Sequence, residues 1–194
     1  MIVRAAFHPV RRALGFSLIE LVVAIVLIAI ALTFMANMFF SNPGRSVEPL
    51  LQIRAAEFGQ GLMEEIQAKP FDQATPIGGI PACAGANCTA SSALGADGAE
   101  TRSDYNDVDD YHSYCLDDGS GAPGWPVVNA LGFAPQDFAR FRMRVCVGYD
   151  DDYDGNINEV GEVDGAKLIR IDIYPPQVGG LGSPITFSAY RGNY

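Results

Sequence analysis

The longest apolar run in the chain lies close to its N-terminus, from Phe16 to Phe40, and contains one charged residue, Glu20. As a helix, these 25 residues would be about 37 Å long, at about 1.5 Å per residue. That length crosses the hydrocarbon core of a bilayer, which is about 30 Å thick. The run is apolar on all sides, unlike an amphipathic surface helix. The pattern therefore predicts a transmembrane helix over residues 16–41.

A second helical pattern follows a break at Asn42-Pro43-Gly44. Proline interrupts helical hydrogen bonding, so the first helix is expected to bend or end there. Apolar residues then recur at helical spacing on one face, which is formed by Leu51, Ala55, Phe58, Leu62 and Ile66. Lys69-Pro70 closes the pattern. We expect residues 42–69 to form the amphipathic second half of one long, bent helix, packed through this face on a sheet.

Three segments in the C-terminal part of the chain alternate between apolar and polar residues, as strands do. They span residues 138–149, 166–174 and 184–191. In the first, Phe141, Met143, Val145, Val147 and Tyr149 share one face, and Arg140, Arg142, Arg144 and Cys146 share the other. Their compact connections favour an antiparallel sheet over residues 138–191 whose apolar face covers the helix. The expected fold class is therefore α+β.

Between the helix and the sheet, residues 71–136 are rich in Gly, Pro, Ala, Ser and Asp and show no sustained period. We expect an irregular loop region here, within a globular region that spans residues 70–194. His112, beside Asp109 and Asp110, is expected to be a solvated loop residue. The arginine stripe of the first strand is either a partner surface or, as we favour, pairs with nearby acidic loops.

The charge of the chain restricts its partners. The 194 residues carry 23 acidic and 13 basic side chains, which give a formal net charge of −10. Nucleic-acid binding needs clustered Lys and Arg, so we expect no nucleic-acid partner. The basic residues ahead of the apolar run, Arg4, Arg11 and Arg12, place the N-terminus in the cytoplasm by the positive-inside rule. The remainder of the chain is then expected beyond the membrane.

The apolar run differs from a cleaved secretory signal, whose apolar region is about 7–15 residues long. A plain membrane anchor fits its length but leaves Glu20 unexplained. An ionisable group within a membrane segment is costly and usually has a function. The run therefore needs an interpretation in which this carboxylate has a role.

Residues Gly15-Phe16-Ser17-Leu18-Ile19-Glu20 provide such an interpretation. With the short basic leader before them and the apolar helix after them, they resemble the prepilin signature of type IV pilins and type II secretion pseudopilins. The resemblance implies that a prepilin peptidase removes the leader, residues 1–15, by cutting between Gly15 and Phe16, and then methylates Phe16. It also implies a pilin-like fold, in which the long N-terminal helix packs on a small antiparallel sheet.

In that family, the apolar helices pack side by side in the core of a filament. The resemblance implies that Glu20 pairs there with the free N-terminal amine of a neighbour, because a buried carboxylate is tolerated only when it is paired. The implied partners are other pilin subunits, the prepilin peptidase and the assembly platform of a pilus or secretion system. The implied location is the bacterial inner membrane, with one membrane span and a periplasmic head, and then the filament. Loss of the basic leader would change the net charge to −13.

Two further stretches carry a narrower resemblance. SVEPLLQIRAAEFGQGLMEEI, residues 46–66, and DVDDYH, residues 107–112, resemble minor pilins of the mannose-sensitive haemagglutinin pilus. These motifs are less specific than the leader, and another minor pilin or a pseudopilin fits them as well. We therefore expect either a minor pilin or a pseudopilin.

All four cysteines lie beyond the membrane helix, at Cys83, Cys88, Cys115 and Cys146. A compartment outside the inner membrane is oxidising, so disulfides are expected. Three connectivities are possible, and we favour Cys83–Cys88 and Cys115–Cys146. Zinc is the alternative, but a single histidine after the leader and the absence of CxxC spacing argue against a zinc site.

An acidic loop, DDDYDGNINEVGEVDG, connects the first two predicted strands. Its first half fits an EF-hand loop, with carboxylates at alternate positions before the turn at Gly155. The second half does not, because Gly161 stands where the bidentate Glu belongs, so a full EF-hand is rejected. A calcium site of another geometry and a solvated acidic turn stay open, and related pseudopilins hold calcium in loops between these strands. The candidate ligands are Asp150, Asp152, Asp154, Asn156 and Glu159.

A rival hypothesis is a membrane-anchored periplasmic enzyme or binding domain that uses the acidic loops. Paired carboxylates are capable of acid–base catalysis. The sequence, however, offers no nucleophile–base constellation, no glycine-rich phosphate loop and no zinc motif. We therefore expect a structural subunit with no enzymatic activity, and no cofactor other than the calcium considered above.

Overall fold

The computed structural model describes residues 15, 17–40, 47–157, 165–177 and 179–194. It divides into two compact units, Met1–Arg45 and Ser46–Tyr194. We call the second unit the head and describe each unit by itself. Leader residues 1–14, Phe16, the segment around Pro43 and the candidate ligand Glu159 lie outside the described residues.

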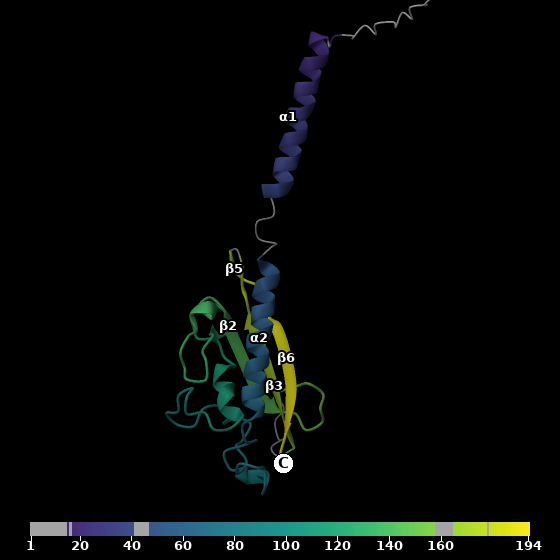
Figure 1. The fold of residues 1–194 in the computed structure, drawn as a ribbon. Coiled ribbons are helices and arrows are strands. Elements are labelled where there is room, and N and C mark those ends of the chain that lie inside the picture. The colour runs from purple at the N-terminus through teal and green to yellow at the C-terminus, as the bar shows by residue number, and fades with distance from the viewer. Residues whose placement is uncertain (1–14, 16, 41–46, 158–164, 178) are drawn as a thin grey trace, which may run out of the picture. The chain divides into compact units, whose positions relative to one another are not determined.

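The first unit contains helix α1, Leu18–Phe40 (Figure 1). Its segment Leu18–Met38 is long and apolar enough to cross a membrane, and none of it is buried within the chain. A helix satisfies its backbone hydrogen bonds internally, as a membrane requires. The hydroxyl of Thr33 likewise donates to the Ala29 carbonyl at 2.8 Å. The predicted N-terminal apolar helix is confirmed.

The head begins with helix α2, Glu48–Gln67, which starts with a proline in its first turn and ends just before Pro70. Proline is tolerated at a helix start because the N–H it lacks has no partner there. The buried face consists of Ala55, Gly59, Leu62 and Ile66, and Leu51 and Phe58 are partly buried beside it. The predicted apolar face is thus confirmed, with Gly59 in addition.

An antiparallel sheet forms the other layer of the head, with strand order β1-β2-β3-β6. The strands are β1 Trp125–Pro126, β2 Arg142–Tyr149, β3 Ala166–Tyr174 and β6 Ile185–Gly192. Val145 lies opposite Ile171, and Ile169 lies opposite Ala189. The three predicted strands are confirmed, but β2 begins four residues late because Gln136–Phe138 form a 3₁₀ turn. Sequence analysis missed β1 and the small hairpin of β4, Pro176–Gln177, with β5, Gly180–Leu181.

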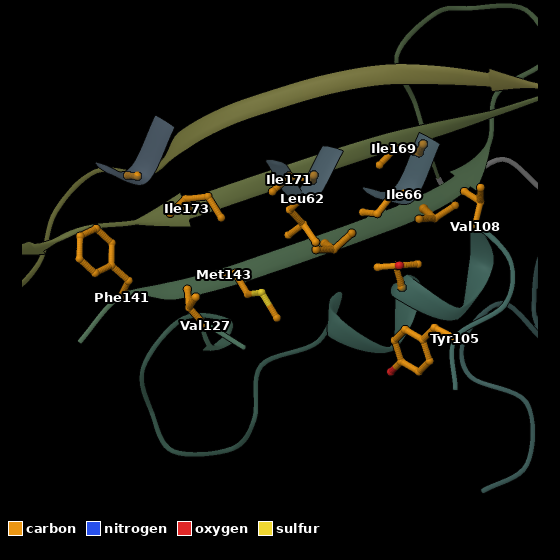
Figure 2. Packing of buried hydrophobic residues seen from close by; sticks show 14 residues of the cluster. Leu62, Ile66, Tyr105, Val108, Val127, Phe141, Met143, Ile169, Ile171 and Ile173 are labelled. Carbon is orange, nitrogen blue, oxygen red and sulfur yellow. The ribbon is translucent and has the colours of Figure 1, made fainter. Parts of the chain in front are cut away.

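The core of the head lies between α2 and the sheet. Figure 2 shows Leu62 and Ile66 of α2 beside Ile169 and Ile171 of β3, and these four side chains are almost fully buried. Apolar burial on this scale is the main force that holds the two layers together. The apolar faces of strand and helix that the sequence predicted therefore meet each other.

Residues 71–136 are irregular, as expected, but they are more than a surface loop. Val108 and Tyr111 are fully buried in the same core as the helix and the sheet, and Tyr105 and Val127 join them. Two of these residues border or lie in the 3₁₀ helix η2, Asp109–Tyr114, which packs on β2. The region shows no period because its core residues come from turns, where neither the helical nor the strand period applies.

Candidate functional site

The start of α1 is the first candidate site. Gly15 and Ser17 are described and exposed, whereas Phe16 lies outside the described residues. The Leu21 N–H donates to the Ser17 carbonyl at 3.2 Å, so the helical hydrogen bonding begins directly after the predicted cleavage point. Glu20 lies in the first turn and is exposed. A carboxylate at this end of a helix interacts favourably with the helix dipole.

Around Glu20, the helix surface is apolar. Leu18, Ile19 and Leu21 are all more than half exposed within the chain. Such a surface is stable only in lipid or against other apolar helices. A carboxylate in that setting needs a cationic or hydrogen-bonding partner, and the geometry leaves Glu20 accessible to one from outside the chain.

Two disulfides join the four cysteines of the head. The structure links Cys83 to Cys88 and Cys115 to Cys146, the pairings that we favoured. The first closes a small loop, and its two cysteines belong to the same buried cluster as Phe71. The second attaches the end of η2 to β2 across a sequence separation of 31 residues. The second bond therefore restrains the irregular region against the sheet, whereas the first closes a loop within that region.

The acidic loop that leaves β2 is organised around the buried carboxylate of Asp150. Its Oδ1 accepts the Asp154 N–H at 3.0 Å and its Oδ2 accepts the Gly155 N–H at 2.9 Å. The Tyr190 hydroxyl of β6 donates to Oδ2 at 2.6 Å. Although burial acts to raise it, these hydrogen bonds hold the pKa of Asp150 below its ordinary value, and the same contact raises the pKa of Tyr190 to about 12.

Three of the candidate calcium ligands converge in this loop. Ligand oxygens of Asp150, Asp152 and Asp154 all lie within 4.8 Å of one another. Asp152 and Asp154 are exposed, and Asp154 accepts the Asn156 N–H at 2.7 Å. Calcium takes 6–8 oxygen ligands at about 2.3–2.6 Å. The three carboxylates would supply part of the oxygen shell of a calcium ion. Both oxygens of Asp150 already accept the hydrogen bonds that shape the loop.

Comparisons with known proteins bear on the N-terminal site. Residues 10–36 match the family model described as the prokaryotic N-terminal methylation motif. The chain carries a prokaryotic N-terminal methylation motif. The motif includes Gly15, Phe16 and Glu20 and supports a type IV pilin-like protein that a prepilin peptidase processes. With the apolar helix, it indicates a single-pass, membrane-anchored protein. Neither a comparison with curated proteins nor one with solved structures gives a match.

Beyond the methylation motif, the arginine stripe of β2 pairs within the head, as favoured. Arg142 contacts Asp118 at 2.6 Å, and Arg144 contacts Asp117 at the same distance. The hydrogen bonds from Arg142 and from Ser120 lower the pKa of Asp118 to about 2. These arginines therefore hold the irregular region on the outer face of the sheet.

The expectation of a solvated His112 is wrong. The residue is half-buried in η2, and its Nδ1 accepts the Val147 N–H of β2 at 3.2 Å. Its neighbours Asp109 and Asp110 are buried as well. A short polar run in an irregular region looks solvated in sequence, because nothing in its pattern shows that η2 packs on a strand.

Sequence analysis also missed a buried cation. Lys167 of β3 is fully buried, and its Nζ lies 2.7 Å from Asp109 Oδ1 and 3.3 Å from Asp72 Oδ2. A signal was present: Lys167 precedes Ile169 and Ile171 at strand spacing, so the alternation places it on the apolar face. A lysine on the buried face of a strand must have a charged or hydrogen-bonding partner in the core, since an unpaired buried charge is very costly.

Proposed function

We propose that the chain is a minor pilin or pseudopilin, a structural subunit that a prepilin peptidase processes and that assembles into or primes a filament. The observation that carries the proposal is the methylation motif, which begins ahead of α1 and extends into this helix. A helix that is apolar on all sides and followed by a separate head is suited to leave the bilayer for a filament core, since both surroundings are apolar.

The proposed sequence of events begins with the leader. Cleavage between Gly15 and Phe16 removes residues 1–15 and frees the amine of Phe16, which is then methylated. Before assembly, the helix of residues 16–41 anchors the subunit in the bacterial inner membrane, and the head lies in the periplasm. Residues 42–69 join this helix to the remainder of the head, residues 70–194.

Glu20 has the central role in assembly. Its carboxylate lies in the first turn of α1, four residues after Phe16. In the filament core the carboxylate pairs with the N-terminal amine of a neighbouring subunit. The pairing compensates two buried charges that would otherwise stand alone. A subunit in the wrong axial register would leave both charges unpaired, so the pair selects the register.

The proposal extends to a filament system and to an ion. Residues 46–66 and 107–112 resemble the minor pilin D of the mannose-sensitive haemagglutinin pilus, but another minor pilin or a type II secretion pseudopilin fits them as well, and this rests on sequence resemblance alone. We further propose that the loop of Asp150, Asp152 and Asp154 binds calcium, with Asn156 and Glu159 completing the ligand set. The convergence of three carboxylates supports it. Copurification of the chain with pilus or secretion subunits would identify the system.

Replacement of Glu20 tests the function directly. In cells that produce the filament, the Glu20→Ala variant is expected to insert in the membrane and to lose its leader, but to be depleted from purified filaments. Glu64→Ala, which removes an exposed carboxylate from α2, is the matched control and should be incorporated like the wild type. Incorporation of Glu20→Ala at the wild-type level would contradict the proposed role.

A further inference from the structure

The buried amine of Lys167 has the surroundings of a reacting group. Its Nζ lies 2.7 Å from Asp109 Oδ1, 3.3 Å from Asp72 Oδ2 and 2.7 Å from the Phe71 carbonyl oxygen. Because a carbon–oxygen bond is about 1.2 Å long, the carboxyl carbon of Asp109 lies within about 4 Å of the amine. Amine and carboxyl carbon are therefore close to the separation of a near-attack arrangement, about 3–3.5 Å.

Aromatic rings close the site around this amine. The ring centroid of Phe71 lies 4.5 Å from Nζ, and that of Tyr149 lies 5.2 Å away. The amine and both carboxylates are almost fully buried. Bulk water is thereby kept from the site. Its exclusion strengthens the electrostatic interactions inside the site and disfavours hydrolysis of a bond formed there.

A third carboxyl group, Asp107, completes the cluster. It is buried and shares a side-chain hydrogen bond with Asp109. Its Oδ1 accepts the N–H groups of Asp109 and Asp110 at 3.0 and 3.3 Å, which fixes its position. Burial, reinforced by the neighbouring Asp109, raises the pKa of Asp107 well above its ordinary value, which favours its protonated form.

Asp72 has the opposite environment. Its two oxygens accept the N–H groups of Ala74 and Thr89 at 3.0 and 2.8 Å. Although burial acts to raise it, these hydrogen bonds and the charge of Lys167 hold the pKa of Asp72 below its ordinary value. Two carboxyl groups whose environments separate their proton affinities are suited to act as acid and base at one site.

We propose that Lys167 and Asp109 condense to form an intramolecular isopeptide bond, and that Asp107 and Asp72 promote the reaction. The geometry of the four side chains carries the proposal. It is independent of the filament function, because it concerns only the internal chemistry of the head.

The reaction balances without any other reagent. The ammonium group of Lys167 gives one proton to Asp72, and its nitrogen then attacks the carboxyl carbon of Asp109. One carbon–nitrogen bond forms and one carbon–oxygen bond breaks, and Asp107 protonates the oxygen that leaves. That oxygen takes a second proton from the attacking nitrogen and departs as water, while the nitrogen keeps one proton as the amide N–H. The proton held by Asp72 returns to Asp107, so both groups end in their starting protonation states.

The link would join β3 to η2, two segments 58 residues apart in the sequence. It would act beside the disulfide of Cys115 and Cys146, which joins η2 to β2. Unlike that disulfide, an amide withstands reducing agents. The bond would also remove one buried ion pair from the core, and such a pair is expensive to keep because both charges are desolvated.

Mass spectrometry of the purified full-length chain tests the proposal. After reduction and alkylation, trypsin should leave residues 103–140 joined to residues 145–170, because a modified Lys167 is not a cleavage site. The joined species should weigh one water molecule less than its two peptides together. If the two peptides separate and trypsin cleaves after Lys167, the proposal is overturned, and the variants described next would not rescue it.

Two variants assign the roles. Lys167→Arg keeps a buried cation but cannot form this amide, so its peptides should separate completely after reduction. Asp107→Asn keeps an acceptor for the N–H groups of Asp109 and Asp110 but carries no acidic proton, so the linked fraction should fall well below that of the wild type. An unchanged linked fraction in Asp107→Asn would overturn the role of Asp107 as proton donor. Linked peptides in Lys167→Arg would show that the bond does not involve Lys167.

Discussion

Two glycines in α2 allow the packing of this helix on the sheet to be measured apart from its helical propensity. A Cβ atom added to Gly59 would lie 2.3 Å from Cε2 and 2.7 Å from Cδ2 of Phe187 in β6. A Cβ atom added to Gly61 would meet nothing within 4 Å. Both glycines lie in the helix interior, so replacement by alanine brings each about the same gain in propensity, roughly 1 kcal/mol.

The two variants should therefore change stability differently. Gly61→Ala is expected to raise the free energy of unfolding by about 0.5–1 kcal/mol. Gly59→Ala gains the same term but loses about 1–3 kcal/mol through overpacking, because the ring of Phe187 must move. Its stability should lie about 1–3 kcal/mol below that of Gly61→Ala. For a head of this size, each kcal/mol corresponds to about 2–4 °C in melting temperature.

Urea unfolding of the head from residue 47, with disulfides intact and followed by circular dichroism, is the assay. A double-mutant cycle adds a control: Phe187→Leu should recover stability in the Gly59→Ala background, relative to its effect in the wild type. If both alanine variants shift the unfolding midpoint equally, with unchanged slopes, the close packing of α2 on β6 at Gly59 would be refuted.

Three further predictions concern the head. Millimolar calcium should raise its melting temperature, and Asp152→Asn should abolish the rise; no shift in the wild type would exclude a calcium site there. Because the pKa of Asp118 is lowered to about 2, its pairing with Arg142 contributes stability above about pH 4 that is lost as pH falls towards 2. Arg142→Ala should weaken that loss, and an unchanged urea midpoint profile over this range would contradict it. Replacing Cys115 and Cys146 by Ser should cost about 4 kcal/mol in urea unfolding, since the bond closes a 31-residue separation; an unchanged free energy would show that the restraint contributes nothing.

The regular part of the fold was accessible from the sequence because its periods are strong. Helix α2 shows its core face through Ala55, Leu62 and Ile66, and β3 shows its own through Ile169 and Ile171. Each of these elements buries one face against the other, and such burial leaves a period in the sequence. Two-residue strands such as β1 are too short to show one.

The irregular region was only partly accessible. Val108 and Tyr111 reach the core from turns, and the pairing of Lys167 with Asp72 and Asp109 joins three separate segments. Such contacts depend on tertiary packing, which a single sequence does not encode in any local period. The alternation in β3 puts Lys167 in phase with the apolar face, a signal that the sequence analysis did not use, whereas no local pattern identifies its partners.

The N-terminal site was accessible for a different reason. Its motif is contiguous: Gly15, Phe16 and Glu20 lie within six residues, so it is visible in the sequence without any tertiary information. The acidic loop was partly accessible from the sequence. Asp150, Asp152 and Asp154 are close in sequence and were predicted together, but the hydrogen bond that Asp150 accepts from Tyr190 depends on the pairing of strands in the sheet.

Processing at Gly15 tests the central claim most directly. The full-length chain would be expressed in cells with and without a prepilin peptidase, and the N-terminus of the membrane-bound product determined by mass spectrometry. We predict that the peptidase yields a chain beginning at N-methylated Phe16, and that Gly15→Val blocks this conversion. A product that still begins at Met1 with an active peptidase, or a Gly15→Val variant processed like the wild type, would contradict the account.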